Sequence, residues 1–170
     1  MMKSEILKNI PESGSFEEVR FDAFGGCTWV KFQDSEYIDW LGVFGYGWGG
    51  GAAIANNSNG VSFVLSNGQG YIVDINSRKL LHKTECDYLK LSIACTSQGF
   101  FVTATDVELY VYDQNGLLFT TKRIASDGIV LNECNNGKVS GRVYGFDKWY
   151  PFSLKIKNQE YKCSWSCPLE

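Results

Sequence analysis

The chain has 170 residues, 44% of them apolar and 15% aromatic, and carries a net charge of −3. These values are typical of a single folded globular domain, residues 1–170, and exclude a disordered chain. The 16 basic residues form no cluster, which argues against nucleic acid as a partner.

The N-terminal stretch, residues 1–8, is too polar and too acidic for a secretory signal, so we expect a cytoplasmic protein. In that compartment the six cysteines are expected to be reduced thiols without disulfides. At most one or two helical turns are expected over Lys3–Asn9. Residues 40–73 carry no charge, but nine of them are glycines, and we therefore expect no membrane span.

A degenerate strand pattern follows at residues 16–44, with strands predicted at 16–21, 27–33 and 37–44. An acidic turn, carrying Asp34, Glu36 and Asp39, separates the last two of these strands. Turn carboxylates are usually solvated, although a converging pair could serve a hydrolase as acid and base. Residues 1–60 hold four basic and eight acidic residues, a net charge of −4.

An aromatic and glycine-rich loop comes next, and it contains Phe44, Tyr46 and Trp48. Its spacing from Gly45 to Gly50 matches the glycine pattern of dinucleotide-binding proteins. That chemistry needs a helix after the glycines, and the turn residues at 56–60 leave no room for one. We therefore expect no cofactor, and interpret the loop as a flexible connection whose rings can bind a partner.

Residues 52–84 and 91–123 are two copies of one pattern, offset by 39 residues. Each divides into four short strands separated by Asn- and Gly-rich turns, and in the first copy these are 52–56, 61–66, 70–75 and 79–83. A third copy spans 129–162, with its turn glycine offset by 38. The matching pairs are Ile54 and Ile93, Gly60 and Gly99, Tyr71 and Tyr110, Asp74 and Asp113, and Asn76 and Asn115.

Four strands in about 40 residues resembles a blade of the β-propeller superfamily, of the WD40 or quinoprotein type. The resemblance rests on the repeat over about residues 52–162, since neither a Gly-His nor a Trp-Asp signature is present. With 16–44 as a degenerate copy, it implies four blade-like antiparallel sheets. A twisted meander or a sandwich of the same strands remains the alternative, and either way the fold class is all-β.

Little in the sequence supports catalysis. His82 is the only histidine, and no nucleophile motif surrounds any serine or cysteine. The pair Cys163 and Cys167, with one histidine in the chain, falls short of a zinc site. We therefore expect no catalytic residues and no metal.

These exclusions favour a non-enzymatic module that binds a protein, in its sharpest form an immunity or inhibitor protein that caps a toxin. This is a resemblance of type: small, acidic and rich in Trp and Tyr. The expected contact residues are Asp34, Glu36, Asp39, Phe44, Tyr46 and Trp48, facing a basic partner. The alternatives are a carbohydrate- or small-ligand-binding propeller-like domain, and a hydrolase that uses the carboxylate cluster.

Overall fold

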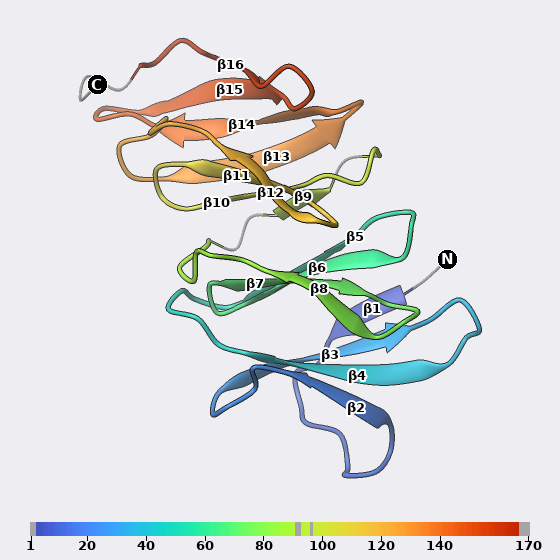
Figure 1. The fold of residues 1–170 in the computed structure, drawn as a ribbon. Coiled ribbons are helices and arrows are strands. Elements are labelled where there is room, and N and C mark those ends of the chain that lie inside the picture. Colours follow the sequence, from blue (N-terminus) through green and yellow to red (C-terminus); the bar gives the residue numbers. More distant parts are fainter. Residues whose placement is uncertain (1–2, 91–92, 96, 167–170) are drawn as a thin grey trace. The chain divides into compact units, whose positions relative to one another are not determined.

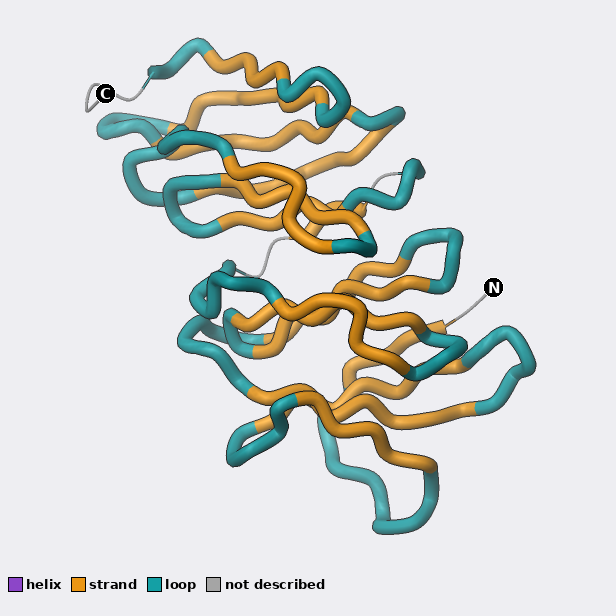
Figure 2. The backbone as a smooth tube through the Cα atoms, in the orientation of Figure 1, coloured by secondary structure: helices purple, strands orange, loops and turns teal. Residues whose placement is uncertain are grey.

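The structure is a computed structural model that describes residues 3–90, 93–95 and 97–166. These residues form sixteen strands in four four-stranded sheets, and no helix occurs among them, which confirms the all-β prediction (Figures 1 and 2). The segment expected to make a helical turn instead begins with strand β1 (Lys3–Ile6). Residue contacts divide the chain into two compact units, 1–91 and 92–170, and the single domain stays a prediction.

The first sheet of unit 1 differs from the predicted copy at 16–44. Its order is β1, β3 (Cys27–Gln33), β4 (Asp39–Gly45), β2 (Glu17–Phe21). β1 therefore belongs to this sheet, and β2 lies on the far edge, parallel to β4. The other strand pairs in the described part of the chain are antiparallel.

The second sheet of unit 1 is an up-and-down meander of β5 (Ala52–Asn56), β6 (Val61–Ser66), β7 (Gln69–Asp74) and β8 (Lys79–Lys83). β6 and β7 are joined by Asn67 and Gly68, both at positive φ, as a tight hairpin turn requires. A core of aromatic side chains joins the two sheets. Trp40 donates its indole N–H to Ile75 O at 3.1 Å, and the Tyr71 hydroxyl donates to Gly45 O at 3.0 Å.

Unit 2 also contains two meanders. One is β9 (Ile93–Cys95), β10 (Phe101–Ala104), β11 (Leu109–Asp113) and β12 (Gly116–Thr120), and the other is β13 (Ile129–Asn135), β14 (Lys138–Tyr144), β15 (Trp149–Lys155) and β16 (Glu160–Cys163). Aliphatic side chains of both sheets share one core, which includes Val102, Val111, Val139 and Leu154.

Strand register confirms the repeat. Val64 lies between Ile54 and Tyr71 in one sheet, and Thr103 lies between Ile93 and Tyr110 in the other, so all three strands keep the offset of 39. A β-bulge interrupts the next strand pair at the same place in both copies. The outer strands β8 and β12 are offset by 37, because the hairpin before β12 is two residues shorter.

The third copy follows the same plan with different side chains. Gly60, Gly99 and Gly137 all have φ between 73° and 86° in the turn before the second strand of their sheets. Phe152 pairs with Gly141 at the register position where Tyr71 pairs with Val64. The third copy has Gly141 where the other copies have Val64 and Thr103, because a Cβ at Gly141 would lie 2.6 Å from the Phe152 ring.

Candidate functional site

Strand β4 separates the two groups of predicted contact residues. It pairs with β3 along its whole length and with β2 from Trp40 to Phe44, both without a register shift, so the strand does not fold back on itself. Seven residues of extended strand span about 20 Å. The turn with Asp34 and Glu36 precedes β4, and Tyr46 and Trp48 follow it, at the opposite end (Figure 1). The six predicted residues do not form one surface.

The acidic turn is held by its own carboxylate. Asp34 is 8% exposed, and its Oδ1 accepts the backbone N–H groups of Glu36 and Ile38, both at 2.9 Å. The pKa of Asp34 is lowered below its ordinary value, mainly by the hydrogen bond from Ile38 N–H and against the opposing effect of burial. The bonds from Glu36 N–H and from the Arg78 guanidinium, which lies 3.4 Å from Asp34 Oδ2, lower it further. Asp34 is thus a structural residue, and reversing its charge would break the turn.

Asp39 is also engaged within unit 1. Its Oδ2 lies 2.7 Å from Lys31 Nζ, and its Oδ1 accepts a hydrogen bond from Gln33 Nε2 at 3.1 Å. The hydrogen bond from Lys31 is the main cause that lowers the pKa of Asp39. Of the three predicted carboxylates only Glu36 is exposed, so the acidic turn offers a partner less negative charge than the sequence indicated.

Phe44 is a core residue, which corrects its prediction as a contact residue. Its side chain is fully buried, and its ring stacks on Phe21 with centroids 4.9 Å apart. Further ring contacts join it to Phe32 and Tyr71. β4 is buried on both faces, so the alternation that normally separates inward from outward side chains is absent.

Tyr46 and Trp48 are exposed, at 54% and 85% of their surface. Two further exposed rings reach the same end of unit 1, which the sequence did not single out. Phe24 comes from the loop after β2, where Gly26 O accepts the N–H of Tyr46, and Tyr88 comes from the segment after β8. We call Phe24, Tyr46, Trp48 and Tyr88 the aromatic end.

The backbone of the aromatic loop, residues 45–50, is fixed rather than flexible. Gly47 N–H donates to Ser66 O, Trp48 N–H to Asp87 O at 2.6 Å, and Gly49 N–H to Asn67 O at 2.7 Å. The glycines allow this close approach. A Cβ on Gly47 would lie 2.3 Å from Asp87 O, and one on Gly49 would lie 2.7 Å from Gly68 Cα. The loop therefore presents Trp48 on a rigid support.

A buried amide fastens the other side of this support. Gln69 Nε2 donates to both Thr84 O and Thr84 Oγ1, at 2.8 and 2.9 Å, and Thr84 Oγ1 donates to Cys86 O at 2.7 Å. Leu89 N–H then donates to Gly68 O at 3.0 Å. The segment after β8, which accepts the N–H of Trp48 through Asp87, is thereby tied to the hairpin between β6 and β7.

The residues weighed for catalysis are dispersed. His82 Nε2 lies 3.1 Å from Glu85 Oε1 on the outer strand β8 and the turn after it. Among residues 3–90, 93–95 and 97–166, no three His, Cys, Asp or Glu side chains are grouped so that they could hold a metal ion. Within the same residues, no helix is long and apolar enough to cross a membrane.

The cysteines that the structure describes in full, Cys27, Cys86, Cys134 and Cys163, are free thiols. Burial raises the pKa of the Cys134 thiol. Cys167 and the side chain of Cys95 lie outside the described part of the chain, so the absence of disulfides stays a prediction for those two.

Comparison with known proteins assigns no family. No family model and no curated protein matches the chain. A computationally designed protein, Ika4, is similar in structure with a TM-score of 0.45 and 14% identity, over 92% of this chain and 94% of that one. A protein of unknown function from Bacteroides caccae gives a TM-score of 0.45 and 15% identity, over 88% of this chain and 60% of that one. At these scores the likeness assigns neither a fold family nor a function.

Proposed function

We propose that this chain is a non-enzymatic protein-binding module and that the aromatic end of unit 1 is its contact surface. One observation carries the proposal: Trp48 is 85% exposed on a backbone fixed by three hydrogen bonds. Exposed tryptophan on rigid backbone is typical of the anchor residues that dominate protein interfaces. A fixed support also reduces the entropy lost when the anchor is bound.

The magnitude is sufficient for an anchor. A tryptophan that becomes buried covers roughly 150–250 Å². With 85% of Trp48 open, covering it removes on the order of 130–210 Å² from water. At about 25 cal/mol per Å² this corresponds to roughly 3–5 kcal/mol before the costs of association. Even half of this gain is within the range of a hot-spot residue.

In its most specific form, the proposed activity is that of a cytoplasmic immunity or inhibitor protein that caps a toxin. The net charge of −4 over residues 1–60 supports a basic partner through long-range attraction. Lys31 and Arg78 neutralise part of the acidic turn, so this attraction comes from unit 1 as a whole. The recurring sheet register supports the further proposal that the sheets resemble propeller blades.

The hydrolase alternative is less well supported. A general acid needs a raised pKa, whereas Asp34 and Asp39 both have lowered pKa values. Both carboxylates also face a cation of the same unit, Arg78 or Lys31. This arrangement is typical of structural ion pairs.

The test begins with co-purification of partners from the cell that produces the protein, followed by binding kinetics with variants. Trp48→Ala should speed dissociation about 30-fold, the equivalent of about 2 kcal/mol. Tyr37→Ala is the matched control, because Tyr37 is 76% exposed at the other end of β4. Glu36→Lys reverses the exposed charge of the acidic turn while leaving Asp34 in place, and it should mainly slow association.

Normal binding by Trp48→Ala, together with weakened binding by Tyr37→Ala, would place the interface at the acidic turn and refute the proposal. Loss of binding in both variants would also count against it, unless circular dichroism shows that either variant is unfolded. Co-purification of a partner alone would not show that the aromatic end is the contact surface.

A further inference from the structure

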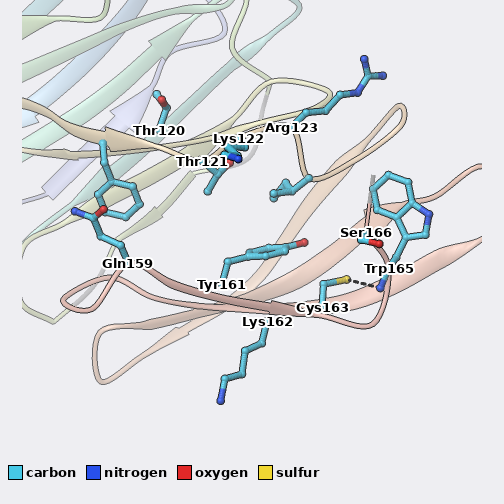
Figure 3. A pocket seen from close by; sticks show the side chains of 12 residues that line it. Thr120, Thr121, Lys122, Arg123, Gln159, Tyr161, Lys162, Cys163, Trp165 and Ser166 are labelled. Atoms are coloured by element: carbon cyan, nitrogen blue, oxygen red, sulfur yellow. Dashed lines mark hydrogen bonds between the residues drawn. The ribbon is translucent and has the colours of Figure 1, made fainter. Parts of the chain in front are cut away.

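The edge strands β12 and β16 of unit 2 border a groove of about 630 Å³ (Figure 3). Each of them is the last strand of its sheet. At the opposite edges of the same two sheets, β9 and β13 contact each other. The groove therefore lies where the two sheets of the unit leave their edges accessible.

In unit 1, the outer strand that corresponds to β12 is β8, and ion pairs fasten it to the edge strand β2. Arg78, just before β8, pairs with Glu17 at the start of β2. Lys83, at the end of β8, pairs with Asp22 just after β2, at 2.7 Å. Charged residues on an edge strand discourage pairing with a further strand. β12 contains no charged residue, so its edge lacks this protection.

Thr120 occupies the position in β12 that Lys83 occupies in β8. Lys83 pairs with Tyr71, and Thr120 pairs with Tyr110, the matching residue of the repeat. Thr120 is exposed and lines the groove. Unit 2 thus has a neutral residue where unit 1 has the lysine that bridges to the neighbouring edge.

The backbone of Thr120 is directed to the open edge of the sheet. Thr121 N–H donates to Leu109 O at 3.0 Å, directly beside the register pair of Thr120 and Tyr110. In an antiparallel ladder such a bond flanks a pair that exchanges no hydrogen bonds of its own. The N–H and C=O of Thr120 therefore point away from β11. Among the described residues, no strand pairs with β12 on that side.

Aromatic rings line the inner side of the groove. Phe119, Tyr161 and Trp165 are partly buried and pack against the core of unit 2. In Figure 3 the Tyr161 ring lies between the two strands. The Trp165 indole stacks on Tyr150 with ring centroids 6.4 Å apart, which holds it in place. The groove therefore offers apolar surface to the side chains of a strand that adds to β12.

The charged residues that line the groove are cations. Lys122 and Arg123 follow β12, and Lys162 lies on β16, whereas the described lining contains no carboxylate. Lys162 is paired with Glu160 at 2.8 Å and contributes less positive charge. Arg123 donates to two backbone carbonyl oxygens, at 3.1 and 2.9 Å, and these neutral acceptors do not cancel its charge. The β12 side of the groove therefore attracts an acidic partner.

We propose that the open edge of β12 binds an extended segment of another protein as an added fifth strand. The N–H and C=O of Thr120 pair with the backbone of this segment. Because side chains alternate along a strand, every second side chain of the segment enters the groove, and these are apolar. Acidic residues at the other positions are attracted by Lys122 and Arg123. The surface belongs to unit 2 and is separate from the aromatic end.

Two other occupants fit this edge less well. A small molecule could fill the groove, but it does not supply the alternating backbone groups that an edge strand pairs with. A second copy of the chain, paired through its own β12, brings the same cations to the edge and no carboxylates. An acidic extended segment matches both the backbone groups and the charge.

The test is a selection of short linear peptides of random sequence on the full chain, followed by calorimetric titration with the best synthetic peptide. Selected peptides should alternate apolar and acidic residues and lack proline at their centre. N-methylation of single peptide amides should weaken binding about three- to tenfold at every second position, the effect of one hydrogen bond. This alternation is specific to strand addition, since a ligand held by its side chains alone does not produce it.

A pair of proline variants locates the binding edge. Thr120→Pro removes the outward N–H and leaves the bonds between β11 and β12 in place, so it should weaken the best peptide about tenfold. Lys83→Pro is the matched control, because it removes the equivalent N–H of unit 1, and it should bind the peptide normally. Circular dichroism checks that both variants are folded.

The inference is overturned if no peptide is enriched, if the N-methyl scan shows no alternation, or if folded Thr120→Pro binds the peptide as well as wild type. Dimerisation that Thr120→Pro abolishes, without peptide enrichment, would assign the edge to a second copy and also overturn it. If Thr120→Pro is unfolded, the N-methyl scan decides. Trp48→Ala should bind the peptide normally, so the outcome is separable from that of the aromatic end.

Discussion

Replacing Gly47 by alanine tests whether the aromatic loop is rigid. The added Cβ would lie 2.3 Å from Asp87 O and 2.6 Å from Gln69 N, both backbone atoms, so the loop must move by about 1 Å. Overpacking of this kind costs about 1–3 kcal/mol. The shift also strains the bonds from Gly47 N–H and Trp48 N–H, worth about 1 kcal/mol each. We expect a total loss of about 2–4 kcal/mol.

Gly50→Ala is the matched control three residues away. No atom lies within 4 Å of its added Cβ, and its φ is outside the left-handed region. Alanine should be neutral there, or stabilising by about 0.4–1 kcal/mol through the unfolded state. The pair therefore separates a packing requirement from a general preference of the loop for glycine.

Urea unfolding measures the difference. With an m-value of about 1–3 kcal/mol/M, Gly47→Ala should lower the midpoint by roughly 1 M or more, and Gly50→Ala should not lower it. Equal midpoints for Gly47→Ala and the wild type would show that the loop yields without cost. That result would refute the claim that Trp48 stands on a rigid backbone, and it would weaken the proposal that the aromatic end is the contact surface.

Three further predictions concern stability and the thiols. Phe44→Ala, at a fully buried site, should cost about 3–5 kcal/mol, whereas Trp48→Ala should cost about 1 kcal/mol or less; similar losses in denaturation would contradict the assigned environments. Because the pKa of Asp34 is lowered in the folded protein, its ionised form stabilises the fold fully above pH 3.8, and this contribution is lost as the pH falls through the lowered pKa. Asp34→Asn should therefore reduce the pH dependence of the free energy of unfolding at acid pH. Superimposable acid branches of the two stability–pH curves would argue against this. Thiol titration of the unfolded chain without reductant should find all six cysteines, and a loss of two would reveal a disulfide.

The strands and turns of the repeat could be predicted from the sequence. Asn- and Gly-rich turns and β-branched runs are local signals, and they placed β5, β6 and β8 at their observed bounds and β7 within one residue. The offset of 39 also holds in the register, because side chains of matching size occupy matching pairs. These features depend on residues that are neighbours along the chain.

The partners of the edge strands could not be predicted in this way. The sheet predicted as a degenerate copy at 16–44 also contains β1 and places β2 parallel to β4, because pairing at an edge is decided by contacts between residues far apart in sequence. The hairpin before β12 is two residues shorter than the hairpin before β8, which changes the offset of this outer strand from 39 to 37.

The candidate site shows the same division. From the sequence, Phe44 and Trp48 are two aromatic residues of one glycine-rich stretch, and only the fold makes one a core residue and the other 85% exposed. The fold also brings the segments that carry Phe24 and Tyr88 to the aromatic loop, and it leaves Asp34 at the other end of β4. Composition thus determined which side chains were available for binding. Burial and proximity followed from tertiary contacts, since these alone decide which faces and loops lie against one another.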